Sequence, residues 1–460
     1  MNRLPRLVSV DDIAAGVRRP AYRPEDHAAG IVHLGIGAFH RAHQAVYTDD
    51  ALAASGGDWR IIGVSLRGTA AADALNPQNG LYTLIERGEG EASGRIIASL
   101  DRVIAATRKP GAALAAMTDP AIRIVSLTVT EKAYGIDRAA GGLDESHSAV
   151  AYDLGDPRAP SGVLGLLVEA LRLRREAGTP PFTVLCCDNL PDNGALLRLG
   201  VVDFASRVDP GLAAWIETSV AFPATMVDRI TPAVTPAALA DTARMTGRDD
   251  QAAIETEVFT QWVIEDHFPQ GRPNWEAGGA IFVADVAPYE RMKLRMLNGT
   301  HSMLAYAGFL AGHTLVRDAM ADPALSALVT RHLKAAAATL APLPGIDLTA
   351  YAASLAARFR NPSIAHETYQ IAMDGTEKLP QRLLQPALVA MEQRQDIRPF
   401  AFAVACWMRY CLGRTDDGVA YALRDPREQH IQAALARVDT RDPAAIAGTL
   451  HALPGVFPAP

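Results

Sequence analysis

A lysine, an asparagine and a histidine stand close together in the stretch PYERMKLRMLNGTHSML, residues 288–304. At about 100° per residue in an α-helix, Lys293, Asn298 and His301 fall at roughly 0°, 140° and 80° around the helix axis, with Glu290 near 60°. The interleaved side chains are mostly methionine and leucine rather than the charges of a solvated helix face. The pattern therefore favours a helix that lines a cleft with a base and two neutral hydrogen-bonding groups.

These residue types suit the oxidation of a secondary alcohol by a nicotinamide. As the hydride leaves, the hydroxyl proton must be removed, and fixed donors must stabilise the oxygen that becomes a carbonyl. A lysine has a reference pKa of about 10.4, so it acts as a base near neutrality only when burial or a cationic neighbour such as Arg295 lowers that value. We interpret Lys293 as the general base, and Asn298 and His301 as donors to the substrate oxygen.

A second stretch, IVHLGIGAFHRAHQ at residues 31–44, begins like a strand that runs into a glycine turn. Gly35 and Gly37 are spaced as the first two glycines of the dinucleotide-binding pattern G-x-G-x-x-G, but His40 stands at the position of the third. Taken alone, the turn is equally compatible with an ordinary connection between a strand and a helix. Arg41 is placed either to reach a phosphate or to pair with an acid of another domain. The candidate cofactor contacts of this loop are Gly35, Ile36, Gly37, Phe39 and Arg41.

The end of the second predicted strand bears on the choice of cofactor. NAD-binding folds carry an acidic residue there, about 20 residues after the glycines, which holds the ribose hydroxyls. Here the strand ends in Arg67 and Gly68, and the first acid after them is Asp73. Arg67 is a candidate contact for the 2′-phosphate of NADP, or else a solvated loop residue. At this point NAD and NADP both stay open.

Three histidines, His33, His40 and His43, lie in the same stretch as the glycines. No glutamate or cysteine stands at zinc-site spacing from them, and HRAH lacks the H-E-x-x-H pattern. We therefore expect packing or cofactor-shell roles for these side chains, and no metal.

The elements that must position these groups change character along the chain. Four apolar, strand-like runs alternate with helical stretches, at residues 30–37, 59–66, 122–130 and 182–189. Continuous apolar runs are typical of strands that are buried on both faces, so they predict an α/β, doubly wound, parallel sheet of Rossmann type. From about residue 290 the sequence shows Ala/Leu-rich helical patterns without a strong strand run, which predicts an all-helical second domain. We predict a Rossmann-type dinucleotide-binding domain at 1–285 and a helical substrate-binding and catalytic domain at 286–460.

Length and composition limit the class of protein. The chain has 460 residues, 49% of them hydrophobic, and a net charge of −7 with no long basic run, so we expect two globular domains and no nucleic-acid partner. The N-terminus has no apolar signal-peptide core, and no run of about 18 apolar residues occurs. We therefore expect a cytoplasmic protein without a membrane partner.

Six motifs are spread over nearly the whole chain. They are GIGAFHRAHQ at 35–44, SLTVTEKAY at 126–134, CDNLPDNG at 187–194, VDRITP at 227–232, WVIEDHF at 262–268 and KLRMLNGTH at 293–301. In combination they resemble the polyol-specific long-chain dehydrogenase family, typified by mannitol 2-dehydrogenase and by fructuronate reductase (D-mannonate oxidoreductase). The resemblance implies a Rossmann-type N-terminal domain, a helical C-terminal domain, a metal-free active site to which both contribute, and a monomer.

The resemblance also assigns roles to particular residues. The lysine base of the family falls on Lys293, and its partner asparagine and histidine fall on Asn298 and His301. A second oxygen-binding asparagine falls on Asn189, and a carboxylate that relays the proton towards solvent falls on Glu290.

Asp228 matches a carboxylate of the family that lies near the substrate. Without the resemblance, Asp228 followed by Arg229 would indicate a surface ion pair, and Asp188 with Asn189 would indicate a helix cap.

Two lysines bear on the substrate. Lys132 in VTEKAY follows a predicted strand, and Lys378 lies in DGTEKLPQR at 374–382. A cation in a cleft can bind a substrate carboxylate, from which a neutral polyol gains nothing, although either lysine is also compatible with a solvated surface charge. Lys132 resembles the sugar-acid branch, so we expect an NAD-dependent interconversion of D-mannonate and D-fructuronate, with D-mannitol and D-fructose as the alternative and other polyols behind it. The remaining alternative is a non-catalytic protein that senses NAD(H), for which the four residues Asn189, Lys293, Asn298 and His301 would be unnecessary.

Overall fold

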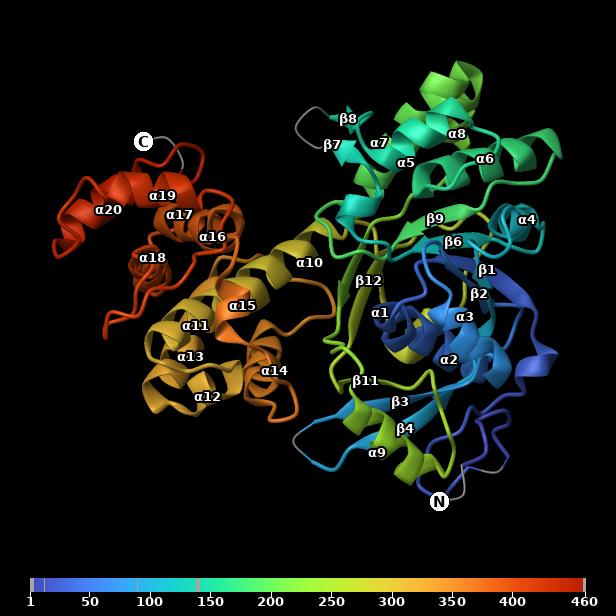
Figure 1. Ribbon diagram of the computed structural model, residues 1–460, viewed down its shortest axis with the longest axis horizontal. Coiled ribbons are helices and arrows are strands. Elements are labelled where there is room, and N and C mark those ends of the chain that lie inside the picture. The colour runs from blue at the N-terminus through green and yellow to red at the C-terminus, as the bar shows by residue number, and fades with distance from the viewer. Residues whose placement is uncertain (1–3, 12, 89, 138–140, 458–460) are drawn as a thin grey trace. The chain divides into compact units, whose positions relative to one another are not determined.

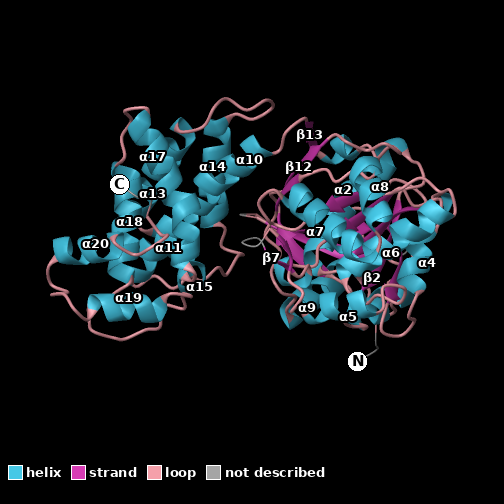
Figure 2. Ribbon diagram, turned by 90° about the horizontal axis from the view of Figure 1, so that it is seen from above, coloured by secondary structure: helices cyan, strands magenta, loops and turns pink. Residues whose placement is uncertain are grey.

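The structure is a computed structural model that describes residues 4–11, 13–88, 90–137 and 141–457. The chain divides into two compact units, Met1–Val286 and Ala287–Pro460. Among the described residues, all named strands lie in the first unit, whereas the second consists of helices and loops (Figure 2). The α/β fold with an all-helical second part, which the sequence predicts, is confirmed.

The first unit is built on a five-stranded sheet with the strand order β5-β2-β1-β6-β9. All four neighbouring pairs are parallel. The chain starts in the middle of the sheet, runs to one edge, and then returns to fill the other side, which is the winding of a Rossmann-type fold. Ligands of such folds bind at the carboxyl ends of the strands, where the winding reverses between β1 and β6. The strands are β1 (Ala29–Leu34), β2 (Arg60–Ser65), β5 (Leu100–Ala105), β6 (Ile124–Leu127) and β9 (Thr183–Cys186).

Both faces of this sheet are buried, as the continuous apolar runs predict. Val32 and Leu34 of β1 pack in a core with helices α6 (Val163–Glu176) and α7 (Asn193–Val208). Ile31, which points to the opposite face, packs with helix α2 (Gln44–Ser55). Figure 1 shows these helices on the two sides of the sheet.

Three of the predicted strands, at 30–37, 122–130 and 182–189, run well past the carboxyl ends of the observed ones, whereas the prediction at 59–66 exceeds β2 by one residue at each end. The structure ends β1 at Leu34, β6 at Leu127 and β9 at Cys186, and the following residues form loops at the carboxyl edge of the sheet. Gly35 leaves the strand because its φ is 96°, a left-handed value that a strand does not contain. The polar motifs that follow each strand therefore lie in loops.

The same unit contains smaller sheets, which were not predicted from the sequence because their strands have no long apolar run. Their order is β10-β12-β13, β11-β3-β4 and β7-β8. The strands are β3 (Tyr82–Arg87), β4 (Ser93–Ile97), β7 (Ile136–Asp137), β8 (Gly142–Leu143), β10 (Thr225–Asp228), β11 (Ile254–Glu257), β12 (Gln261–Glu265) and β13 (Ile281–Val283). The remaining helices of the unit are α1 (Ala38–Ala42), α3 (Ala70–Leu75), α4 (Ala112–Thr118), α5 (Ser148–Gly155), α8 (Pro210–Ser219) and α9 (Pro236–Thr246).

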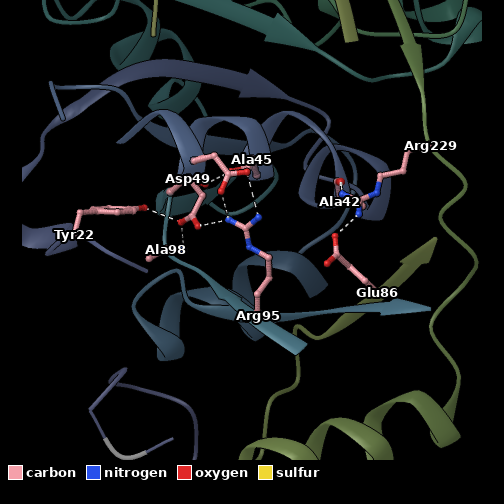
Figure 3. Close-up of polar contacts among 10 residues, drawn as sticks. Tyr22, Ala42, Ala45, Asp49, Glu86, Arg95, Ala98 and Arg229 are labelled. Carbon is pink, nitrogen blue, oxygen red and sulfur yellow. Dashed lines mark hydrogen bonds and ion pairs between the residues drawn. The ribbon is translucent and has the colours of Figure 1, made fainter. Parts of the chain in front are cut away.

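A buried ion-pair network fastens α2 to β4 (Figure 3). Arg95 of β4 donates to the carboxylates of Asp49 and Asp50, each at 2.7 Å. Asp49 also accepts hydrogen bonds from the Tyr22 hydroxyl at 2.8 Å and from the Ala98 amide at 2.9 Å. Burial raises the pKa of Asp49, and the charge of Arg95 opposes that rise. The first crossover helix is thus tied to the strand beside it by charged groups, of which Arg95 and Asp49 are shielded from water.

The second unit is arranged around helix α11, whose residues are nearly all buried and which packs against α13, α15 and α18. Two π-helical turns interrupt its helices: η5 (Lys293–Asn298) joins α10 to α11, and η6 (Pro380–Leu384) joins α16 to α17. The helices are α10 (Ala287–Met292), α11 (Gly299–Leu310), α12 (Val316–Ala321), α13 (Pro323–Ala338), α14 (Leu348–Arg360), α15 (Thr368–Ala372), α16 (Gly375–Leu379), α17 (Gln385–Glu392), α18 (Arg398–Tyr410), α19 (Glu428–Leu435) and α20 (Pro443–His451).

None of the helices in the described ranges is both long and apolar enough to cross a membrane. All four cysteines are free thiols, and only Cys406 is partly accessible.

Candidate functional site

The lysine and the asparagine of the first motif lie at the two ends of the π-helical turn η5. The amide of Gly299 donates to the carbonyl of Leu294, five residues earlier, instead of four. Such a turn holds more residues than an α-helical turn, so Lys293 and Asn298, five residues apart, come closer to the same side than they would in an α-helix. The regular α-helix that we expected here is wrong in this respect, since it would rotate the two side chains about 140° apart. Single π turns are rare in proteins. Those that do occur are often found at functional sites.

Lys293 is 7% exposed and lies between the fully buried Met292 and Met296. Arg295, the expected cationic neighbour, donates to the carbonyl of Thr339 at 2.8 Å. Glu290 is half-buried on α10, three residues before the lysine. The lysine therefore lies in an apolar part of the second unit, with a carboxylate about one helical turn away.

His301 on α11 is held by rings rather than by hydrogen bonds. Its imidazole stacks on Phe359 at 5.2 Å between ring centroids and meets the edge of His366 at 4.6 Å. Its Nε2 atom is buried and has no hydrogen-bond partner among the described residues. Burial, and then the nearby His366 and the cations around it, lower the pKa of His301 well below its usual range. The ring is therefore neutral near pH 7, and its buried Nε2 atom has an unused hydrogen-bonding capacity.

Two cations of the helix that follows α15 lie in the same region. Lys378 on α16 donates to the carbonyl of Met373 at 2.6 Å and pairs with Asp374 at 3.4 Å. Arg382 on η6 donates to the hydroxyl of Ser302 on α11 at 3.1 Å. Both cations contribute to lowering the pKa of His301. Sequence reasoning selected Lys378 but missed Arg382, although their spacing of one helical turn in DGTEKLPQR places them on one face.

Gly35 and Gly37 of the glycine turn in the first unit differ in the physical reason for which each is a glycine. Gly35 has φ of 96°, and a Cβ atom added to it would lie 2.1 Å from the carbonyl oxygen of Thr128. Gly37 has an ordinary extended backbone with φ of −90° and precedes α1. A Cβ atom added to Gly37 would meet nothing closer than 3.9 Å, the carbonyl of Gly35. The turn thus has free space over the backbone of Gly37, which fits the close approach of a dinucleotide pyrophosphate.

The other expected cofactor contacts of this region differ in their surroundings. Ile36 is buried, with its side chain next to Gly63 of β2. Phe39 is half-buried and stacks on His43 at 5.1 Å. Arg41 donates to the carbonyl of Ala252 at 2.5 Å, within the first unit, and so is engaged with the backbone there. Arg67 is exposed after the end of β2. Asp73, the first acid after it, pairs with Arg108 at 2.5 Å.

The histidines of the glycine turn are buried packing residues. His33 hydrogen-bonds with the hydroxyls of Ser126 and Thr128, each at 2.8 Å, and stacks on His40 at 3.5 Å. Burial lowers the pKa of His33 to about 3 and that of His40 well below its usual range, so both rings are neutral. Within the described residues, no group of three or more His, Cys, Asp or Glu side chains is arranged to hold a metal ion.

The loops that follow β6 and β9 are joined by Asp188. Its carboxylate accepts hydrogen bonds from the amides of Val129 at 3.0 Å and Thr130 at 3.1 Å, and from the Tyr134 hydroxyl at 2.6 Å. Burial raises the pKa of Asp188, and these hydrogen bonds oppose the rise. Thr130 has φ of 74° and ψ of 152°, a region otherwise reserved for glycine. Strain of this kind persists where surrounding contacts enforce it, which is frequent at functional sites.

Asp188 therefore binds the neighbouring loop and does not cap a helix, since α7 starts only at Asn193. Asn189 follows it as an exposed residue at the carboxyl edge of the sheet, and Lys132 is exposed on the short turn Glu131–Ala133 of the adjoining loop. The structure brings these two predicted residues to the same edge, where a Rossmann-type sheet binds its ligands.

Asn193, which sequence reasoning missed, fastens the end of β9 to β10. Its side-chain amide donates to the carbonyls of Asp188 at 3.0 Å and Thr225 at 2.9 Å, and its oxygen accepts from the amide of Thr225 at 2.9 Å. The signal that points to it is the repeat of Asp-Asn within CDNLPDNG, whose second asparagine is Asn193.

Asp228 ends β10 and is 6% exposed. The interpretation of Asp228 and Arg229 as a surface ion pair is wrong, because the Arg229 side chain is buried and pairs with Glu86 of β3 at 2.7 Å. Arg229 also donates to the carbonyl of Ala42 at 2.6 Å, at the end of α1 (Figure 3). It thereby links the strand that carries Asp228 to the helix of the glycine turn.

Comparison with known proteins adds the following. Residues 29–277 match the family model of the mannitol dehydrogenase Rossmann domain, and residues 285–451 match that of the mannitol dehydrogenase C-terminal domain. The chain is 46% identical to D-mannonate oxidoreductase from Escherichia coli (strain K12), with 91% of this chain and 87% of that protein aligned. It is 40% identical to mannitol 2-dehydrogenase from Cereibacter sphaeroides, with 90% and 88% aligned. The ternary complex of Pseudomonas fluorescens mannitol 2-dehydrogenase with NAD and D-mannitol has a TM-score of 0.82 and 39% identity to this chain, covering 98% of it and 92% of that chain.

Proposed function

Because the chain belongs to the mannitol dehydrogenase family of oxidoreductases, we propose that it interconverts D-mannonate and D-fructuronate with NAD as the cofactor. The observation that carries the proposal is the polar set of the second unit: the buried Lys293, with Asn298 on the same π turn, and the buried Nε2 atom of His301 without a partner. A non-catalytic NAD(H) sensor has no use for a buried amine and an unsatisfied imidazole.

In the proposed reaction, Lys293 removes the proton of the substrate hydroxyl. Asn298 and His301 donate hydrogen bonds to the oxygen as it becomes a carbonyl, and the neutral state of His301 suits this role because it avoids a second full charge beside the lysine. Glu290 passes the proton from the lysine towards solvent. Asn189 and Asp228 contact the substrate hydroxyls and oxygen, and no metal takes part.

The glycine turn of Gly35, Ile36 and Gly37 is assigned to the pyrophosphate of NAD, because of the free space over Gly37. Bound there, NAD would supply the acceptor for the hydride. Phe39 and Arg41 are assigned to the shell of this turn. NAD is preferred to NADP because the related mannitol 2-dehydrogenase is described in complex with NAD. If the protein preferred NADP, the exposed Arg67 after β2 would be the candidate contact for its 2′-phosphate.

The choice of a sugar acid rests on the cations and on the relatives. Lys378 and Arg382 lie close enough to His301 to affect its pKa, and the exposed Lys132 lies at the edge of the first unit. D-mannonate oxidoreductase is also a nearer relative, at 46% identity, than mannitol 2-dehydrogenase at 40%. The second candidate, conversion of D-mannitol to D-fructose, is favoured by the likeness to a structure that contains D-mannitol.

The test is a comparison of initial rates of NADH and NADPH oxidation with D-fructuronate and with D-fructose. We expect NADH with D-fructuronate to give the highest kcat/KM. A clear preference for D-fructose would establish the second candidate, and cofactor binding without turnover on any polyol or sugar acid would establish the sensor. The expected monomer is tested separately by light scattering of the purified protein.

A further inference from the structure

Arg382 is a cation without an acidic partner. It is half-buried, and the hydrogen bond of its guanidinium goes to the neutral hydroxyl of Ser302. Among the described residues, no carboxylate forms an ion pair with Arg382. Asp374 is near enough for its charge to oppose the lowering of the pKa of Arg382 by burial, but the ion-pair partner of Asp374 is Lys378. Removing a charge from water is costly unless an opposite charge or several hydrogen bonds replace the water. An anion that comes from outside would fill this need.

Three buried arginines of the first unit provide the contrast. Arg95 pairs with Asp49 and Asp50, and Arg229 pairs with Glu86, so each of these two has a carboxylate of the protein (Figure 3). Arg174 donates instead to three backbone carbonyls, whereas the side chain of Arg382 has a single hydrogen bond within the described part of the chain. Burial lowers the pKa of Arg382, but a guanidinium stays protonated in proteins and keeps its fork of donors. This fork matches the two oxygens of a carboxylate.

Arg382 is also fixed next to the turn that carries Lys293 and Asn298. The two π turns η5 and η6 pack against each other. A Cβ atom added to Gly299, which follows Asn298 directly, would lie 2.7 Å from the carbonyl oxygen of Arg382. The backbone that bears Arg382 therefore touches the beginning of α11, which also bears His301.

We propose that Arg382 binds the carboxylate of a sugar-acid substrate through its guanidinium fork, with Lys378 as a second cation, and so selects sugar acids over neutral polyols. This inference rests on the proposed function, because it names the residue that recognises the acid group. The alternative role for Arg382 is structural, as a link from η6 to Ser302 on α11.

The experiment compares Arg382→Gln, Arg382→Lys and Ser302→Ala with the unmodified protein. For each, kcat and KM are measured with NADH for D-fructuronate and for D-fructose. We expect Arg382→Gln to lower the ratio of kcat/KM for D-fructuronate to that for D-fructose by about 10- to 100-fold, the usual effect of losing a hydrogen bond to a charged group. The loss should lie mainly in KM, and Arg382→Lys should fall between Arg382→Gln and the unmodified protein. Ser302→Ala should keep the ratio, since it removes the link and leaves the charge.

Arg331→Gln on α13 is the matched control, since it removes an exposed arginine of the same unit. A second readout needs no turnover: D-mannonate should raise the melting temperature of the unmodified protein more than D-mannitol does, and Arg382→Gln should abolish that difference. If the unmodified protein reduces D-fructuronate but Arg382→Gln loses activity equally on both substrates, the assignment of Arg382 fails and the proposed function stands. If the unmodified protein reduces only D-fructose, the sugar-acid function fails, and the assignment of Arg382 fails with it.

Discussion

Gly35 and Gly37 provide a matched pair of substitutions, because they are glycine for different physical reasons. At Gly35, φ is 96° and an added Cβ atom would lie 2.1 Å from a backbone oxygen. A left-handed backbone costs an alanine about 1–3 kcal/mol, and displacing the Thr128 loop adds a similar amount. We therefore expect Gly35→Ala to lower the free energy of unfolding by about 2–6 kcal/mol.

Gly37→Ala separates cofactor binding from stability. The backbone of Gly37 has φ of −90°, and an added Cβ atom would have no neighbour within 3.9 Å. The free energy of unfolding should stay the same or rise by up to about 1 kcal/mol, because alanine restricts the unfolded chain. If the pyrophosphate approaches this backbone, however, the methyl group holds it away, and the Kd for NADH should rise about 10- to 100-fold through the loss of a hydrogen bond to a charged group.

The assays are fluorescence titration with NADH and urea unfolding, applied to both variants and to Gly448→Ala. Gly448 lies in α20 of the second unit, and an added Cβ atom there would meet nothing within 4 Å, so this control should bind NADH normally. An unchanged Kd for NADH in a stable Gly37→Ala variant would refute the assignment of the turn to the pyrophosphate.

Three further predictions concern other parts of the chain. Lys293→Met should lower kcat at least about 100-fold and leave the Kd for NADH within about threefold, and a variant that keeps a tenth of the turnover would exclude the lysine as the base. Arg95→Met should lower the free energy of unfolding by about 3–5 kcal/mol in urea, because Asp49 stays buried without its cation, whereas the exposed Arg102→Met should change it little. Burial lowers the pKa of His33 to about 3, so the unfolded chain binds a proton more readily than the folded one. The free energy of unfolding must therefore fall as the pH drops below about 6.5, by about 2 kcal/mol at pH 5. His33→Gln should show a shallower decline in urea titrations between pH 7 and 5.

The parts of the fold that the sequence predicts are those with a strong apolar signal. The parallel strands are buried on both faces, so Ile31, Val32 and Leu34 form a run without polar interruption except His33, which is hydrogen-bonded. The small sheets have strands such as β11, with the sequence IETE, whose polar residues make them resemble loops. Their register depends on partners distant in the sequence, which a local pattern does not contain.

The residues of the candidate site were predictable by type but not by geometry. Lys293, Asn298 and His301 stand out because polar groups interrupt an apolar helix. The π turn that carries Lys293 and Asn298 was not predicted from the local pattern, and it packs against η6, which is distant in the sequence. Arg229 shows the same limit: its neighbour Asp228 predicts an ion pair, but the partner is Glu86 on a distant strand.

The contact between the two π turns concerns two groups of residues: those proposed to recognise the substrate and those proposed to remove its proton. On the proposed assignments, η5 carries the base and one oxygen-binding group, and η6 carries the cation that recognises the acid. Gly299, which directly follows η5, lies close to the backbone carbonyl of Arg382, so this contact does not depend on the Arg382 side chain. Its single hydrogen bond reaches Ser302, one turn further along α11. We therefore expect a change of the side chain at 382 to alter the charge offered to the substrate and to leave the backbone of Lys293 and Asn298 in place. On the proposed assignments, one substitution at position 382 would exchange a sugar acid for a neutral polyol and keep the same base.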